Sequence, residues 1–356
     1  MKAVSRPRLV YTTSIMASFA RNDIALLGRE FEVVPHVFAP RKRWMTPLSL
    51  FKQCFFLLRN GFTADVFICM FGGYHSLLPV LLGKLRRRPT IVIVGGFDAV
   101  SFPSFRYGAH HRFPLGWFVR CSLRSATHIV PVSDNLVNST THYLPNSTDP
   151  HQQGYRAFDP GNSVPYTIIA YGYDAQRFKP MKRGEGVSFI TVAQMNAPNF
   201  LRKGVDLMFM LAERYPQHRF TLVGNTPSMH YDRVPPNLEL KNFVAYERLP
   251  EEYAAHTFYL QLSMWEGFPS APCEAMLCGC VPIVSRVAAM PEIVGDAGFI
   301  LDRKEPQALF ELVEKALASD LDALSVRARQ RIMERYPPTE REKLLELVRK
   351  LRGKAM

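Results

Sequence analysis

Residues 265–276 read WEGFPSAPCEAM, and they follow the apolar, strand-like run at 258–262. The turn at 267–270 is predicted to open a helix with Ser270 as its N-cap. This puts Glu266 in the loop after a strand and Glu274 about one turn inside the helix. Backbone N–H groups at a helix start favour an anion, so the segment predicts a ligand site that both glutamates could face.

The order of strand, turn and helix recurs along the 356 residues. Runs such as 90–94 and 187–192 are continuously apolar and β-branched, which is typical of parallel strands covered on both faces. We therefore predict an α/β protein with two doubly wound, Rossmann-like domains facing a cleft, and ligands beyond the carboxyl ends of the strands. We expect an N-terminal acceptor domain at 1–172, a second domain at 173–336 that binds a nucleotide-sugar donor, and a helix at 337–356 that could pack back across the seam.

The net charge of +13 points to an anionic partner, such as nucleic acid, a lipid surface or a phosphorylated substrate. Basic clusters at 41–43 and 84–88 adjoin apolar stretches that are too short to span a bilayer. We predict neither a signal peptide nor a transmembrane helix, and six cysteines without a CxxC pair favour a reducing compartment. The expected location is cytoplasmic, with peripheral binding to the cytoplasmic face of an anionic membrane as a further expectation.

The spacing of Glu266 and Glu274, with Gly-Phe after the first and Ala-Met after the second, resembles the signature of the retaining family 4 glycosyltransferases. That family has the two-domain glycosyltransferase B fold. The resemblance implies that Glu266 contacts the donor sugar of a nucleotide sugar and that Glu274 binds its ribose hydroxyls. It also implies that the turn between them lines the donor site, through Gly267, Phe268, Pro269 and Ser270.

A basic pair before a glycine extends the resemblance. The family's lysine at this place binds the donor diphosphate, which implies that Lys203 stabilises the departing phosphate charge. Family members usually carry an arginine just after the preceding strand, where Gln194 stands here. Arg202 could compensate for that missing charge, and Gly224, at the end of the next strand, is placed in the donor site as well.

The N-terminal half departs further from the family pattern. Thr13 lies where a glycine-rich turn is common, so its hydroxyl is expected to face the donor phosphates. Asp98 follows the central strand and could hydrogen-bond the donor sugar or the acceptor hydroxyl, which makes it the third catalytic candidate after Lys203 and Glu266. It could equally be a turn residue. His75 and Gly96 are candidates for acceptor contacts, although a lone histidine is more often structural.

Two further phrases differ from the family. Ala288 and Ala289 replace a Gly-Gly pair, and the nearby Glu292 is expected to support a helix start. No metal cluster is visible, because the DxD-like pair Asp320 and Asp322 lies in a charged, helical region. We therefore expect no metal and no cofactor, with the nucleotide sugar as a substrate.

The predicted activity is retaining transfer of a sugar to a hydroxyl of a glycan or lipid-linked acceptor, in cell-surface polysaccharide or glycoconjugate synthesis. Three alternatives remain open: an epimerase or phosphorylase of the same fold, a non-catalytic protein that binds a nucleotide sugar, and a basic nucleic-acid-binding protein. The last has no aromatic-basic RNA motif in its favour, so nucleic acid is not expected as a partner.

Overall fold

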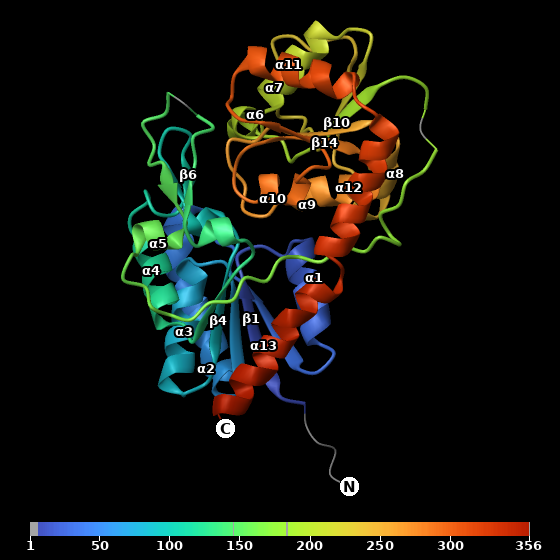
Figure 1. The fold of residues 1–356 in the computed structure, drawn as a ribbon. Helices are drawn as coiled ribbons and strands as arrows, with labels where there is room; N and C mark the ends of the chain where they lie inside the picture. The colour runs from blue at the N-terminus through green and yellow to red at the C-terminus, as the bar shows by residue number, and fades with distance from the viewer. Residues whose placement is uncertain (1–5, 145, 183, 356) are drawn as a thin grey trace. The chain divides into compact units, whose positions relative to one another are not determined.

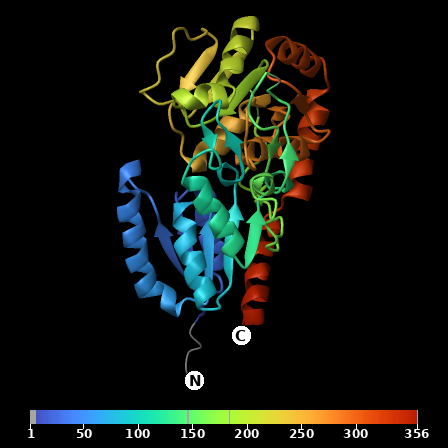
Figure 2. The ribbon, with the colours of Figure 1, turned by 90° about the vertical axis from the view of Figure 1, so that its left-hand side faces the viewer.

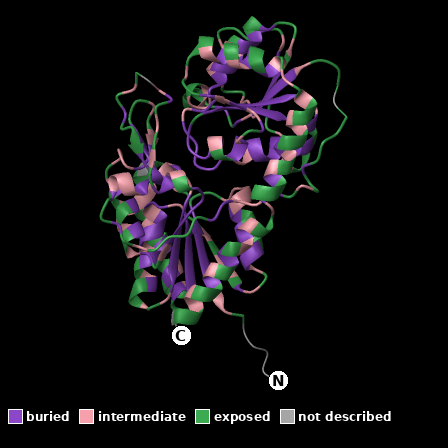
Figure 3. Ribbon diagram, in the orientation of Figure 1, coloured by how far each residue is buried: buried purple, intermediate pink, exposed green. Residues whose placement is uncertain are grey.

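The computed structural model describes residues 6–144, 146–182 and 184–355, without the side chains of 43 and 355. The chain divides into two compact units. The first contains residues up to 140, 152–171 and 339–356, and the second contains 141–151 and 172–338. Both are α/β units, as Figure 1 shows, and in both the strands form the buried layer (Figure 3).

The first unit is built on a five-stranded parallel sheet in the order β2-β1-β3-β4-β7. These strands are Glu32–Val37, Arg8–Thr13, Val66–Met70, Thr90–Val94 and His128–Pro131. Its helices are α1 (Ser18–Leu27), α2 (Thr46–Asn60), α3 (Tyr74–Leu85), α4 (Leu115–Ser125), the single turn α5 (Tyr155–Phe158) and α13 (Thr339–Ala355). The strand order changes direction between β1 and β3, which is where such sheets bind ligands.

The second unit has a six-stranded parallel sheet in the order β12-β11-β10-β13-β14-β15. The strands are Leu238–Lys241, Arg219–Val223, Ser188–Val192, Phe258–Gln261, Val281–Ser285 and Phe299–Leu301. The helices are α6 (Ala197–Arg202), α7 (Val205–Arg214), α8 (Leu249–Ala254), α9 (Ser270–Leu277), α10 (Met290–Val294), α11 (Pro306–Leu317) and α12 (Leu321–Arg335). Here the order reverses between β10 and β13, so the crevice for a ligand lies beyond these two strands.

The continuous apolar runs explain both sheets. Every residue of β3, β4 and β14 is buried, because each strand is covered on both faces. The prediction of two doubly wound, Rossmann-like sheets is confirmed. β2 is the edge strand and contains Pro35, which an edge tolerates because one side of the strand has no ladder partner.

The C-terminal helix is fixed to the first unit by a buried ion pair. Arg341 of α13 donates to both carboxylate oxygens of Asp23 in α1, each at 2.7 Å, and to the carbonyl of Ile169. The Tyr11 hydroxyl donates to the same carboxylate at 3.1 Å. The last helix of the chain is therefore part of the core of the first unit.

Residues 141–151 leave the first unit and pack in the second. Tyr143 is fully buried there, and its carbonyl accepts a hydrogen bond from the backbone N–H of Lys304. From β9 (Gln152–Gln153) onward the chain is again in the first unit, where the Asp159 carboxylate pairs with Arg124. The loop-like composition at 145–165 thus covers a crossing between units followed by ordered structure.

Candidate functional site

The crevice of the second unit receives two charged side chains, one from each side of the strand-order reversal. Lys203 follows α6, beyond the end of β10, and Glu266 lies just beyond the end of β13. Gly204 fixes this arrangement, since it has a left-handed φ of 70° and a Cβ there would lie 2.0 Å from the carbonyl oxygen of Leu262. Only glycine fits this approach, which brings Lys203 next to the β13 end.

Lys203 and Glu266 form an ion pair, with 2.5 Å between Nζ and Oε1. The same oxygen accepts hydrogen bonds from Ser263 Oγ at 2.7 Å and Gln261 Nε2 at 3.2 Å. Burial alone would raise the pKa of Glu266, but the charges of Lys203 and Arg202, with hydrogen bonds from Lys203 and Ser263, lower it below the ordinary value. Glu266 is therefore a carboxylate at neutral pH, and it orients a lysine that retains exposed surface.

Glu274 lies on α9 in a different environment. Its carboxylate accepts a hydrogen bond from the Tyr253 hydroxyl at 3.2 Å, and Tyr246 also bonds to it. Burial raises the pKa of Glu274 to about 7, and the two tyrosine hydroxyls only partly offset this effect. The two glutamates thus differ in protonation at neutral pH, one ionised and one close to half-ionised.

The start of α9 differs from the sequence prediction. The helix begins at Ser270, so the N-cap position falls on Pro269, and the prediction that Ser270 caps the helix is wrong. The Ser270 hydroxyl instead accepts a hydrogen bond from the Tyr173 hydroxyl at 3.1 Å. Phe268, in the turn, stacks on Tyr173 with 6.5 Å between ring centroids. Aromatic packing therefore holds the turn that connects Glu266 to Glu274.

The other candidates of the second unit surround this crevice. Arg202 donates to Asn199 Oδ1 and also contributes charge near Glu266. Gln194 is exposed just after β10, and its carbonyl accepts from the Asn199 side chain. Gly224 has a φ of 101°, and a Cβ there would lie 2.4 Å from the Ala193 carbonyl oxygen. Gly224 is needed where the ends of β10 and β11 come together.

Ala288, which replaces the first family glycine, keeps a glycine-like backbone with a φ of 46°. A left-handed conformation costs a residue with a side chain about 1–2 kcal/mol, whereas glycine adds about 0.5–1 kcal/mol of entropy loss on folding. We expect Ala288→Gly to raise the free energy of unfolding by about 0.5–1 kcal/mol, measured by urea denaturation. Ala289→Gly is the matched control, because Ala289 has an ordinary φ of −75° and should lose stability. Equal losses in both variants would show that the backbone at 288 carries no strain.

The first unit has a separate cavity of about 430 Å³ at its own strand-order change. It is lined mainly by aromatic and glycine residues from the ends of β3 and β4 and from nearby loops: Phe38, Phe71, Gly72, Gly73, Tyr74, Gly95, Phe97 and Tyr107, with Ser14, His75 and Asp98 among the polar residues. The sequence drew attention to Asp98, His75 and Gly96 but did not identify the aromatic lining.

Asp98 connects the two glycine turns beside this cavity. Its carboxylate accepts backbone N–H groups of Gly72 at 2.8 Å, Gly96 at 2.9 Å and Gly95 at 3.1 Å. Burial raises the pKa of Asp98, and these three hydrogen bonds oppose that shift. Both carboxylate oxygens are therefore already bonded to the backbone, which is the turn role that the sequence left open.

His75 and Thr13 are similarly engaged in local structure. The His75 ring bonds to the Met70 carbonyl through Nε2 at 2.8 Å, and burial lowers its pKa to about 4, so the ring is neutral at pH 7. The Thr13 hydroxyl donates to the carbonyl of Ile15 at 2.8 Å and accepts from the Ile15 N–H. It therefore closes the turn after β1.

Within residues 6–144, 146–182 and 184–355, no group of three or more His, Cys, Asp or Glu side chains could hold a metal ion. The acidic pair at 320–322 has a local role, because the Asp320 side chain caps α12 by accepting from the Ala323 N–H. Glu292 accepts from Arg335 and Tyr336. None of the helices in the described part of the chain combines the length and the apolar character that crossing a membrane requires.

Two doubly wound sheets with ligand crevices at their reversals define the glycosyltransferase B class, and solved structures share this fold. Sucrose-phosphate synthase from Thermosynechococcus elongatus is similar with a TM-score of 0.72 and 14% identity, covering 98% of this chain and 100% of that one. HepE from Anabaena in complex with UDP and glucose has a TM-score of 0.68 and 14% identity, covering 96% and 100%.

Residues 174–335 match the family described as glycosyl transferases group 1, and the chain belongs to this family through its second unit. O-antigen chain mannosyltransferase B of Escherichia coli is 37% identical over 78 residues, which are 22% of this chain and 20% of that protein. The phosphatidylinositol N-acetylglucosaminyltransferase of Arabidopsis thaliana contains a polypeptide that is 25% identical over 162 residues, 42% of this chain and 36% of that protein. The matched segments thus span only a fifth to about a third of these curated relatives.

Proposed function

We propose that the protein is a retaining glycosyltransferase, which moves a sugar from a nucleoside-diphosphate sugar to a hydroxyl of a glycan or lipid-linked acceptor. One observation carries this proposal: the Lys203–Glu266 ion pair lies at the strand-order reversal of the unit that belongs to the group 1 glycosyl transferases. A cation beside a positioned carboxylate is suited to a leaving diphosphate and to the hydroxyls of the transferred sugar.

In the proposed mechanism, Lys203 stabilises negative charge as the bond between sugar and diphosphate breaks. Glu266 holds the Lys203 ammonium and contacts the donor sugar, and Glu274 accepts the ribose hydroxyls. The acceptor attacks from the side of the leaving phosphate, which takes the acceptor proton. Arg202, Gln194, Gly224 and the turn Gly267-Phe268-Pro269-Ser270 complete the proposed donor site, and no metal is required.

For the first unit we propose acceptor binding in the aromatic cavity. Asp98, Gly96 and His75 shape or line its edge, and Asp98 is a positioning residue rather than a proton carrier because its oxygens are engaged by backbone N–H groups. Thr13 is proposed only to support the turn after β1. The relatives named for O-antigen chain and phosphatidylinositol glycosylation support a role in glycan or glycoconjugate synthesis at the cytoplasmic side of a membrane.

The raised pKa of Glu274 predicts a pH-dependent nucleotide affinity. A carboxyl group with a pKa of about 7 is about one-tenth ionised at pH 6 and about nine-tenths ionised at pH 8. If the ionised form accepts the ribose hydroxyls, UDP should bind up to about tenfold more tightly at pH 8 than at pH 6. Calorimetric titration checks this. Glu274→Gln, or 2′,3′-dideoxy-UDP with the unchanged protein, should lose this gain, and an equal gain in all three cases would remove Glu274 from the ribose site.

A thermal-shift screen against nucleotide sugars tests the proposed function, because a ligand that binds only the folded state raises the melting temperature. We expect one nucleotide-sugar class to raise it, and nucleoside diphosphate to be released only when an acceptor is added. Binding without release would favour a non-catalytic protein, and conversion without an acceptor would favour an epimerase. If no nucleotide sugar changed the melting temperature, the proposal would be wrong.

A further inference from the structure

Helix α2 of the first unit presents an apolar surface to solvent. Leu48, Phe51, Phe55 and Leu58 all lie on its outward side, and Trp44 and Phe62 extend the same surface from the 3₁₀ turns before and after the helix. These six side chains are 45% to 74% exposed. Single exposed apolar residues are common, whereas a contiguous stripe of this kind marks an interaction surface.

The opposite side of α2 supplies its packing in the fold. Gln53 and Leu57 are buried, with Leu57 in a cluster with Val10 and Phe67, and the Phe56 ring stacks on His36 at 4.4 Å. With about 100° of rotation per residue, Phe51 and Phe55 point about 160° away from Gln53. Figure 2 shows α2 at the outer edge of the first unit. The stripe is therefore not needed to build the core.

Positive charge is concentrated in the same part of the chain. Residues 33–97 contain nine Lys and Arg and a single acidic residue, Asp65, which gives 9 − 1 = +8 of the total net charge of +13. Asp65 itself pairs with Arg88. Lys52 and Arg59 are exposed on α2, on one flank of the stripe. The apolar surface is thus bordered by cations without neighbouring acids in the sequence.

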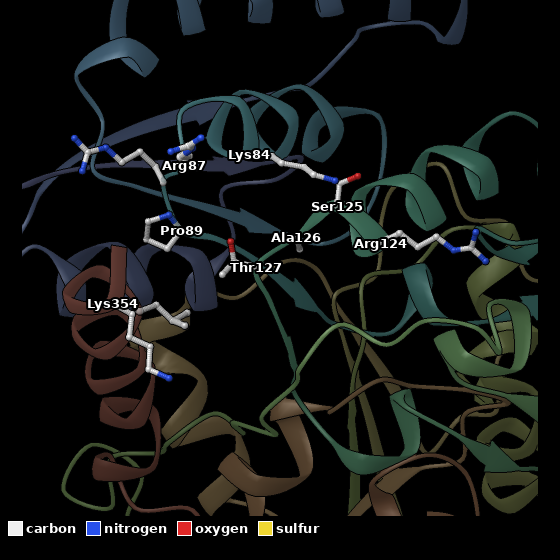
Figure 4. Close-up of a pocket in the computed structure, with 10 residues that line it drawn as sticks. Lys84, Arg87, Pro89, Arg124, Ser125, Ala126, Thr127 and Lys354 are labelled. Carbon is white, nitrogen blue, oxygen red and sulfur yellow. The ribbon is translucent and has the colours of Figure 1, made fainter. Parts of the chain in front are cut away.

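This surface continues onto the end of α3, which packs beside α2 through Leu78 and Leu82. Leu85 is 79% exposed there, and the Arg86 guanidinium lies 5.2 Å from the centre of the Phe62 ring. Next to it is a basic pocket of about 430 Å³, shown in Figure 4, with Lys84, Arg87, Arg88, Arg124 and Lys354 in its lining. The amino ends of the strands therefore add a second group of cations.

We propose that α2 docks on an anionic lipid surface. Its apolar stripe enters the boundary between headgroups and acyl chains, while Lys52, Arg59 and the cations at the end of α3 contact lipid phosphates. Charge complementarity favours this occupant over a second copy of the chain, since two such faces would repel each other. The inference deepens the proposed function, because it would hold the enzyme at a surface that contains lipid-linked acceptors.

Flotation of the full chain with vesicles tests the docking. We expect binding to phosphatidylcholine vesicles that contain phosphatidylglycerol, and little binding to phosphatidylcholine alone. Phe51→Ser with Phe55→Ser should weaken partitioning by at least tenfold, since two rings leave the lipid phase. Lys52→Gln with Arg59→Gln should weaken it by about fivefold per charge, with a loss of salt dependence.

Phe243→Ser is the matched control, because Phe243 is 85% exposed but lies in the second unit. It should bind vesicles like the unchanged protein. Alanine at positions 41–43, the basic run found in the sequence, should weaken binding less than the double phenylalanine change; the Arg43 side chain lies outside the described residues. All variants are checked for unchanged melting temperature.

Trp44 offers a second measurement. It is 74% exposed, whereas Trp265 is buried. In a Trp117→Phe background, anionic vesicles should shift the fluorescence of Trp44 to shorter wavelength, and brominated lipids should quench it. Trp44→Phe should abolish both effects.

Two results would overturn the docking inference. One is vesicle binding that survives the double phenylalanine change, together with Trp44 fluorescence that does not respond to lipid. The other is a stable dimer in lipid-free buffer that Phe51→Ser with Phe55→Ser converts to a monomer, which would assign the stripe to a contact between copies. Donor binding is measured separately without lipid, so absent docking with normal UDP affinity would remove this inference and leave the proposed activity intact.

Discussion

Replacing Lys203 by Ala is expected to lower kcat/KM for sugar transfer by about 10²–10³-fold, the effect of removing one preorganised group from developing negative charge. The Lys203 side chain is held by Glu266 at 2.5 Å and placed by the Gly204 backbone. It is therefore already oriented before a ligand binds, so little reorganisation is needed when the diphosphate departs. Initial rates of nucleoside diphosphate release measure the loss.

The control separates catalysis from folding. Lys203→Ala leaves the buried Glu266 carboxylate without its ion-pair partner, which by itself destabilises the second unit. The double variant Lys203→Met with Glu266→Gln removes that uncompensated charge and should recover most of the melting temperature but no activity. If Lys203→Ala kept a rate within threefold of the unchanged enzyme, Lys203 would have no role at the leaving group.

Arg341→Met is expected to lower the free energy of unfolding by about 3–5 kcal/mol, because it leaves a buried carboxylate without its partner. Asp23 is 1% exposed, and both of its oxygens accept from Arg341. The substitution also removes the donor to the Ile169 carbonyl. Urea denaturation followed by circular dichroism measures the effect, with the loss assigned to the first unit.

The matched control lies on the same helix. Arg349 of α13 pairs with Glu30, but both side chains are largely exposed, so Arg349→Met should change the urea midpoint little. The double variant Asp23→Leu with Arg341→Met should be far more stable than Arg341→Met alone, because the buried charge is gone. Similar losses for Arg341→Met and Arg349→Met would contradict the role of the buried pair.

The fold was predictable because its signals are local. Continuous β-branched runs followed by turns identify parallel strands without knowledge of their partners, and both sheets are present as predicted. The donor-site candidates were predictable for the same reason. Glu266 and Glu274 belong to one short motif, and Lys203 precedes a glycine whose backbone requirement the structure explains.

What the sequence did not predict depends on contacts between distant segments. Tyr253 and Tyr246 bond to Glu274 and come from a part of the chain with no recognisable motif. Ser270 was wrongly expected as the helix cap because capping preferences do not fix a boundary to one residue. The three N–H groups bonded to Asp98 come from two strand ends, which no sequence pattern brings together.

The outward face of α2 is a different case. Its apolar residues are visible in the sequence, but a helix with apolar residues on two sides does not reveal which side the core uses. Packing of Leu57 against Val10 and Phe67 resolves this, and leaves Phe51 and Phe55 exposed. The sequence therefore indicated a basic, apolar region, and the structure identifies the surface.

The central claim is that the second unit binds the diphosphate of a nucleotide sugar through Lys203. Calorimetric titration of UDP and of uridine into the unchanged protein and Lys203→Ala tests it most directly. We predict that UDP binds the unchanged protein much more tightly than uridine does, and that Lys203→Ala removes most of this difference while leaving uridine affinity unchanged. Equal UDP affinity in the two proteins would contradict the assignment of the donor site.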